Sequence, residues 1–225
     1  VQDEQAKVAE AVAFYNLSAI PVVDDQRHLV GIITHDDVID VIRKETTDDV
    51  HRISAVEPLA DSYMRTPLLT LSRKRGTWLT ILFFTGLLTA LALRHYNSEL
   101  ERYEWLIWFL PLIISSGGNS GSQSATLVIT GIATHDIDRN DIGTIVRLTG
   151  LLLGSFLGAI GFSVALFLAP SFYAALVIPF TILTVVTCGT TLGSILPIIL
   201  QSMKLDPALM SNPMIAGLSD ILGIV

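Results

Sequence analysis

The sequence is poor in cysteine and in basic residues. Cys188 is the only cysteine among 225 residues, which excludes an intramolecular disulfide framework. It lies in an apolar run, where we expect it to be a small packing residue. The 14 Lys and Arg are outnumbered by 21 Asp and Glu, and a net charge of −7 argues against general nucleic-acid binding, which needs basic surface. None of the five histidines has the spacing of a zinc site or of a nucleophile–base pair.

Charge is scarce in the second part of the chain. Residues 1–75 hold 13 acidic and 9 basic residues, whereas residues 76–225 hold 8 and 5 in twice the length. The composition is 51% hydrophobic, and the mean hydropathy is +0.58. Long apolar runs predict an all-α membrane domain at 77–225, because a helix needs about 20 apolar residues to cross a bilayer. The expected spans are 77–93, 105–133, 144–169, 171–200 and 209–225, the last of them short of a full crossing.

The flanks of these runs predict an orientation. Arg73, Lys74 and Arg75 precede the first run, and the positive-inside rule then places the N-terminal side in the cytoplasm of a multi-pass cell-membrane protein. The chain opens with Val1 inside a helical pattern and ends inside an apolar run, so we expect a fragment of a longer protein.

Asp220 is a lone carboxylate in the apolar stretch 210–225. A charge at mid-bilayer costs at least about 2.5–3.5 kcal/mol, so such a residue usually faces an aqueous path or a partner. The alternative is an interfacial position from which the side chain reaches water. Position alone leaves both interpretations open.

The run 105–133 contains ISSGGNSGSQSAT, a block of small and uncharged polar residues at 114–126. Small residues let membrane helices pack closely, so the block fits a packing face. Asn119 and Gln123, four residues apart among several serines, fit instead a wet wall that faces a cation. We favour the pathway interpretation over packing alone.

Residues 18–42 have the pattern of strand, turn, strand and helix, with Asp36 as the expected helix N-cap. They resemble the C-terminal part of a CBS module, which we place at 1–42. An acidic connecting helix is expected at 36–57 and a linker at 58–76. In some CBS proteins the spacing of Thr34 and Asp37 holds the ribose of an adenine nucleotide, which implies ATP as a ligand of this module. The helix carries seven acids, which fit either a solvated face or a binding surface for Mg²⁺ or Ca²⁺. Six of them are the candidate sensor residues Asp36, Asp37, Asp40, Glu45, Asp48 and Asp49, and the seventh is Glu57.

These features together with GGNSGSQSATL and LDPALMSNPMIAGLSDILG resemble the MgtE family of magnesium transporters and channels. The resemblance implies a homodimer with five membrane helices per subunit, preceded by a CBS region and a connecting, or plug, helix. It implies that Asp220 holds a largely hydrated Mg²⁺ in the pore, that Asn119 lines the path, and that Gly118 and Ala216 shape it. It also implies that cytosolic Mg²⁺ bridges the acids of this helix with acids of the CBS and N-terminal domains and closes the pore.

The expected function is therefore Mg²⁺ homeostasis through a Mg²⁺-selective, self-gated channel with no enzymatic step, and with Mg²⁺, lipid and a second subunit as partners. A secondary carrier that exchanges a divalent cation for Na⁺ or H⁺ would use similar polar spans. A membrane-anchored nucleotide-sensing CBS protein would explain the N-terminal part but not Asp220 or the GGN block.

Overall fold

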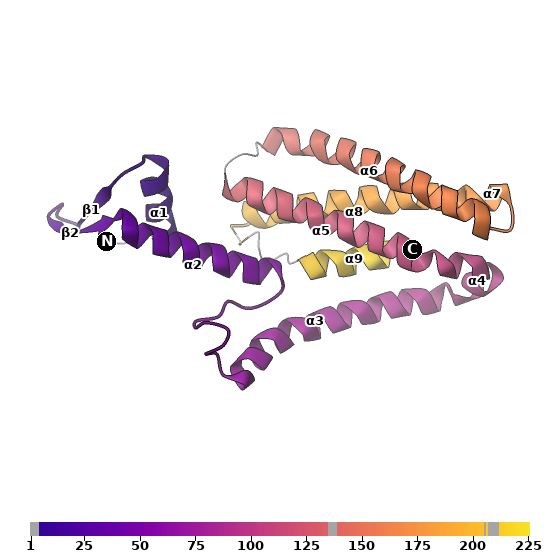
Figure 1. Cartoon of the computed structure of the whole chain (residues 1–225), viewed down its shortest axis with the longest axis horizontal. Helices are drawn as coiled ribbons and strands as arrows, with labels where there is room; N and C mark the ends of the chain where they lie inside the picture. The colour runs from indigo at the N-terminus through magenta and orange to yellow at the C-terminus, as the bar shows by residue number, and fades with distance from the viewer. Residues whose placement is uncertain (1–4, 135–138, 205, 207–211) are drawn as a thin grey trace.

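A hairpin and two helices form the N-terminal part of the chain in this computed structural model, which describes residues 5–134, 139–204, 206 and 212–225 (Figure 1). Helix α1 (Gln5–Phe14) is followed by the antiparallel strands β1 (Ala19–Val23) and β2 (Leu29–Thr34) and by helix α2 (His35–Ile53). Ala9, Val12 and Val38 form the small core where α1 packs against α2. The element order matches the strand–turn–strand–helix pattern predicted for 18–42.

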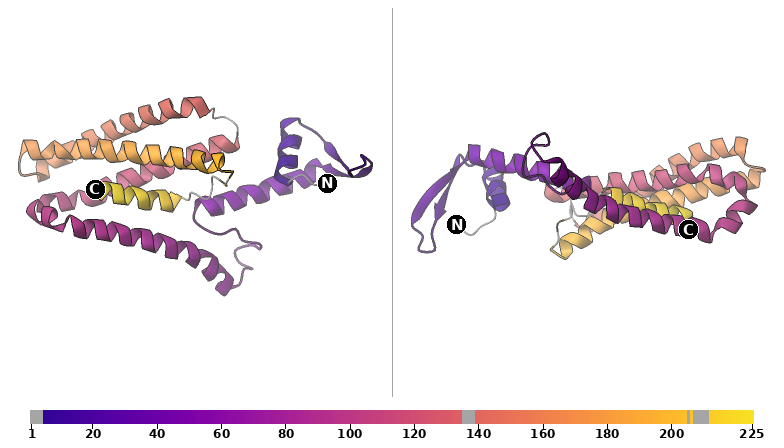
Figure 2. Two further views of the ribbon diagram at one scale, coloured as in Figure 1. Left: turned by 180° about the vertical axis from the view of Figure 1, so that it is seen from behind. Right: turned by 90° about the horizontal axis from the view of Figure 1, so that it is seen from below.

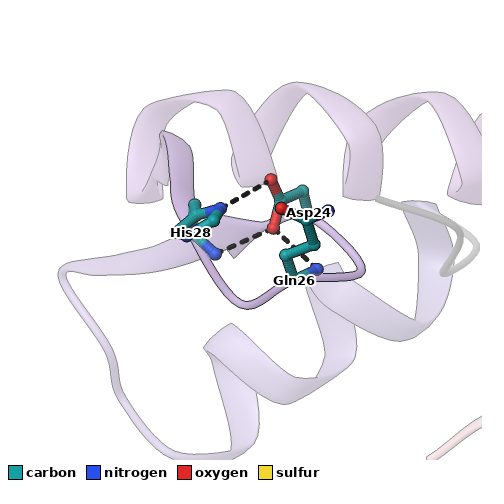
Figure 3. A network of polar contacts seen from close by, with 3 residues as sticks. All are labelled: Asp24, Gln26 and His28. Carbon is teal, nitrogen blue, oxygen red and sulfur yellow. Dashed lines mark hydrogen bonds and ion pairs between the residues drawn. The ribbon is translucent and has the colours of Figure 1, made fainter.

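Asp24 closes the turn between the two strands. One of its carboxylate oxygens accepts hydrogen bonds from the backbone N–H groups of Gln26 (2.9 Å) and His28 (2.8 Å) (Figure 3). The other lies 3.3 Å from Nδ1 of His28. Arg27 adopts φ = 63° in this turn. Short acidic side chains favour turns because they can bond the backbone of the next few residues, as Asp24 does here.

Helix α2 begins earlier than the sequence suggested. Thr34, and not Asp36, is its N-cap, and Asp37 accepts hydrogen bonds from the Thr34 backbone N–H (3.0 Å) and hydroxyl (2.6 Å). A carboxylate in the first turn also interacts favourably with the helix dipole. The helix ends at Ile53, before the expected end at Glu57.

Eight helical segments follow the connection at 54–67 in the described chain. They are α3 (Leu68–His95), α4 (Asn97–Arg102), the 3-10 helix η1 (Glu104–Trp108), α5 (Leu110–Ala133), α6 (Arg139–Leu168), α7 (Phe172–Ala175), α8 (Val177–Ser202) and α9 (Asn212–Ile224). Within the described residues, three stretches are long and apolar enough to cross a membrane: Leu68–His95, Leu148–Leu168 and Phe172–Ser202. The structure thus supports a helical membrane domain, while the count of five spans stays a prediction.

Two of the expected spans are different in kind from those three. Helix α5 has 24 residues and a length of about 36 Å, enough for a bilayer core of about 30 Å, but it carries the polar block. Helix α9 has 13 residues, and residues 209–211 of its expected span lie outside the described part of the chain. Helix α3 starts at Leu68, inside the segment expected to be a linker.

Helix α8 lies between α5 and α6, and α9 packs against α5 on the other side (Figures 1 and 2). The main core is formed by residues of η1–α5, α6, α7 and α8, among them Phe109, Ile113, Ile178 and Ile182. Helix α3 touches chiefly α9, and most of its large apolar side chains are exposed, as expected for a surface that faces lipid. Cys188 is exposed on α8, so the prediction of a packed thiol was wrong.

Candidate functional site

The polar block of helix α5 divides between two faces. On one face Gly117, Ser120 and Gly121 are buried. A Cβ added to Gly189 or Gly193 of α8 would overlap the carbonyl oxygens of Gly117 and Gly121, respectively, so the two backbones pack directly against each other. The hydroxyls of Ser120 and Thr190 form a buried hydrogen bond of 2.7 Å across this contact. This face confirms the packing interpretation.

The other face of α5 is polar and exposed. Ser115, Asn119 and Gln123, which we call the polar stripe, follow one another at intervals of four residues and therefore lie on one side of the helix. Asn119 donates a hydrogen bond to Ser115 within the stripe (3.2 Å). If α5 spans the bilayer as predicted, these exposed polar side chains need water or a polar partner. The block therefore provides a packing face on one side and a candidate ion-facing surface on the other.

Helix α9 brings Asp220 close to this wall. Gly118 faces Ala216, where an added Cβ would lie 3.4 Å from the Ala216 Cβ, and Gly223 faces Ile114 in the same way. The two helices therefore run antiparallel, and Asp220 lies beside the segment between Ile114 and Gly118. Its side chain is half-buried and forms no hydrogen bond or ion pair with any described residue. A carboxylate that has no protein partner is available to a cation.

Three polar side chains fix the start of α9 against α5. Ser122 donates a hydrogen bond to the backbone carbonyl of Asn212 (3.1 Å), and the Asn212 side-chain amide donates to Thr126 (3.1 Å). These residues, with Gln123 and Leu127, line an open pocket of about 400 Å³. The motif that contains Asn212 is evident in the sequence, but this anchoring role of the residue is not.

The end of helix α2 reaches this same region. Ile53 packs against a cluster formed by Ala125 and Ile129 of α5 and Ile215 of α9. Arg52 forms an ion pair of 2.5 Å with Asp206, which lies between α8 and α9. Helix α2 therefore contacts both α5 and the segment that leads into α9. Sequence reasoning missed Asp206 because 154 residues separate it from Arg52.

The six acids expected to sense cations do not gather into one cluster. Among the described residues, no group of three or more His, Cys, Asp or Glu is placed to hold a metal ion. Asp49 is the member closest to the bundle. Burial raises the pKa of Asp49 above its ordinary value of 3.8, and the negative charge of Asp206 raises it further, whereas Arg52 opposes the rise.

Thr34 and Asp37, the expected nucleotide contacts, do lie together. Their hydrogen bonds to each other cap α2 and lower the pKa of the Asp37 carboxyl below 3.8. The pair thus has a structural role whether or not a nucleotide binds. A role in nucleotide binding stays a prediction.

Comparison with known proteins relates the chain to two families. The sequence model of the MgtE family, described as divalent cation transporters, matches residues 110–225, and that of the CBS domain matches residues 3–44. The chain is 37% identical to the magnesium transporter MgtE of Thermus thermophilus, 31% to that of Bacillus subtilis and 32% to that of Enterococcus faecalis.

These alignments cover 99%, 99% and 100% of this chain, but 50%, 49% and 50% of the relatives. The chain therefore spans about half the length of the curated relatives it matches. The relatives are transporters and not enzymes, in agreement with the absence of an enzymatic step in our expectation. The family model covers more than half of the chain, including both α5 and α9, and the chain therefore belongs to the MgtE family.

Proposed function

We propose that this chain forms the pore and part of the gate of a Mg²⁺-selective, homodimeric channel in the cell membrane, with the CBS side in the cytoplasm. The observation that carries the proposal is Asp220, a half-buried carboxylate without a protein partner among the described residues, beside the polar stripe of α5. Three related proteins that bear the name magnesium transporter support the choice of ion.

The chemistry of the site suits a hydrated Mg²⁺ as the transported ion. Mg²⁺ loses its water ligands reluctantly and is usually bound through one or two carboxylates with several waters retained. Asp220 supplies one carboxylate per subunit, and a second subunit would supply another. The neutral oxygens of Ser115, Asn119 and Gln123 can accept hydrogen bonds from the retained waters without adding charge.

Gating is proposed to act through helix α2. Its end contacts α5, α9 and Asp206, and its acidic residues run from Asp36, in the CBS module, to Asp49, close to that end. Cytosolic Mg²⁺ bound by these acids would reduce their mutual repulsion and hold α2 in its docked position. Loss of the ion would release α2 and open the path, which is the two-state coupling that allostery requires.

The direct test replaces Asp220 by Asn in protein reconstituted into vesicles loaded with a Mg²⁺-sensitive dye. We expect Mg²⁺ influx driven by a membrane potential to fall to background, because the amide carries no charge to attract the ion. Asp61→Asn, which changes an exposed acid outside the bundle, is the matched control. Normal influx through the Asp220→Asn variant would disprove the pore assignment.

The same vesicles separate a channel from a carrier. A channel conducts Mg²⁺ under a membrane potential with no Na⁺ or H⁺ gradient, whereas an exchanger needs the gradient of its coupling ion. Influx that stops when that gradient is abolished at constant membrane potential would select the carrier.

A further inference from the structure

The segment that leads into α3 exposes large apolar side chains. Met64, Leu68 and Leu69 are 89%, 81% and 85% exposed, and Tyr63 is 62% exposed. Such a contiguous group on a described surface indicates a partner or a membrane. The first turns of α3 lie at the end of that helix farthest from α4 (Figure 1), within the Leu68–His95 stretch that is long and apolar enough to span.

Basic side chains surround this apolar group. Arg65, Arg73 and Arg75 are exposed, and no acidic side chain of the described residues forms an ion pair with any of them. Lys74 behaves differently, because it turns inward to Glu57 (3.4 Å) and to the carbonyl of Pro58. Three arginines thus keep their charge available to an external anion.

The helical period connects this surface to the lipid-facing side of α3. Leu68, Arg75 and Leu79 are spaced seven and four residues apart and share one face of the helix. Leu79, Phe83 and Phe84 farther along α3 are also exposed. The apolar surface expected to meet acyl chains therefore extends toward Arg75, while Arg73, two residues earlier, lies on another side of the helix.

We propose that residues 63–75 dock on the membrane surface and bind the headgroups of anionic phospholipids. Arg65, Arg73 and Arg75 contact the phosphates, while Met64, Leu68 and Leu69 are seated at the boundary with the acyl chains. The charge of the arginines complements an anionic headgroup, and the apolar neighbours fit a lipid rather than a small soluble anion. The inference requires that α3 crosses the bilayer, but it does not depend on which ion is transported.

Trp78 is a natural reporter, because it lies three residues beyond Arg75. Replacing Trp105 and Trp108 by Phe leaves it as the single tryptophan of the chain. The full chain is reconstituted in vesicles of phosphatidylcholine in which a rising fraction of lipid is brominated phosphatidylglycerol or brominated phosphatidylcholine. Quenching of Trp78 by the two brominated lipids gives their relative binding next to this residue.

We expect phosphatidylglycerol to bind more strongly by about fivefold for each arginine engaged. The preference should decrease as salt is added, because salt screens exposed charges. Replacing all three arginines by Gln should abolish the preference, whereas replacing them by Lys should keep it. The matched control replaces Arg94 and Arg102, at the other end of α3 and in α4, by Gln and should leave the preference intact.

A Trp78 signal with equal quenching by the two lipids would overturn the proposal. So would a preference that survives the three Gln substitutions or one that is lost in the Lys variant. The apolar contact has its own test, in which Met64→Cys in a Cys188→Ser background carries an environment-sensitive fluorophore. We expect its emission to shift to shorter wavelength in phosphatidylglycerol vesicles relative to phosphatidylcholine, and unchanged emission would disprove docking of this segment.

Discussion

Asp220 and Asn119 show what a single side chain can reveal in an apolar sequence. A charge in hydrocarbon costs at least about 2.5–3.5 kcal/mol, so Asp220 stands out from the sequence alone. Asn119 is a candidate pathway residue because several serines and Gln123 lie near it in the sequence. The structure adds that the two helices carrying these residues are in contact, through Gly118 and Ala216. The family relationship then supports, but does not test, their role as ion contacts.

The Thr34–Asp37 pair makes a prediction about acid. Its hydrogen bonds lower the pKa of Asp37, so the stabilisation that the ionised carboxylate gives to α2 is fully present above pH 3.8 and is lost as the pH falls through the lowered pKa. Thr34→Val removes the hydroxyl donor, and we expect the pKa of Asp37 to move back toward 3.8. A carboxyl-carbon NMR titration measures it.

Thr46→Val is the control for this titration, because the Thr46 hydroxyl bonds only the carbonyl of Ile42 in its own helix. It should leave the pKa of Asp37 where it is. An unchanged Asp37 pKa in Thr34→Val would show that the hydroxyl is not the cause of the shift.

The contacts between helices could be predicted less well from the sequence than the positions of the helices themselves. Apolar runs located α3, α6 and α8 because their length and composition are distinctive. The small and polar residues of α5 are evident in the sequence. Their separation into a packed face and an exposed face could not be predicted from it. That separation depends on which helix lies where. The partner glycines at 189 and 193 lie in TCGTTLGS (187–194), a second run of small and polar residues whose pairing with α5 the sequence does not reveal.

The contact between α5 and α8 predicts a strong effect of one methyl group. Gly193→Ala should lower the free energy of unfolding by about 1–3 kcal/mol, because the added Cβ would overlap the Gly121 carbonyl. Gly86→Ala in α3 is the matched control, since nothing lies within 4 Å of its added Cβ. Thermal unfolding in detergent measures both. Equal loss of stability in the two variants would contradict the close backbone contact.

The ion pair between α2 and the bundle predicts a specific coupling. Arg52→Gln and Asp206→Asn should each weaken the docking of α2, and the double variant should cost about 1 kcal/mol less than the sum of the two, because either single change already breaks the pair. Cross-linking of α2 to α5 or electrical recordings of closure measure docking. Arg43→Gln, which breaks the exposed pair with Asp40 on the same helix, is the control and should have no effect. Additive effects of Arg52 and Asp206 would show that they act separately.

Considered as an assembled protein, the proposed channel joins a cytoplasmic sensor to a membrane path through one helix. The acids of α2 were visible in the sequence, but their function could not be deduced from it, since a solvated face has the same composition. The structure places Asp48 and Asp49 in the half-buried part of α2 near the bundle and leaves Asp36, Asp37, Asp40 and Glu45 exposed along the helix. A shared cation site at those positions would therefore draw ligands from a further part of the protein or from a second subunit.

The raised pKa of Asp49 indicates how a cation would act. Because burial disfavours the ionised form of Asp49, protonated Asp49 favours the docked position of α2. This contribution to docking is fully present below pH 3.8 and is lost as the pH rises through the raised pKa. At neutral pH a bound Mg²⁺ would offset the same charge. Replacing Asp48 and Asp49 by Ala should therefore make closure depend less on internal Mg²⁺, which patch recordings at graded Mg²⁺ can measure. Asp25→Ala in the β1–β2 turn is the control, and an unchanged Mg²⁺ dependence would identify Asp48 and Asp49 as ordinary surface charge.

The backbone contact of α5 with α8 has a consequence for how the path can widen. These helices cannot slide past or approach one another, because Gly121 and Gly193 already leave no space between them. The α5–α9 contact also involves side chains, since an added Cβ would lie 3.4 Å from Ala216 at Gly118 and 2.9 Å from the Ile215 side chain at Gly121, and α3 is held chiefly by α9. We therefore expect α5 and α8 to move as one body if the proposed pathway widens, with α9 and α3 changing position relative to them. Helix α2 contacts α5 through Ala125 and Ile129 and α9 through Ile215, so its departure would remove one of the contacts that couple these helices.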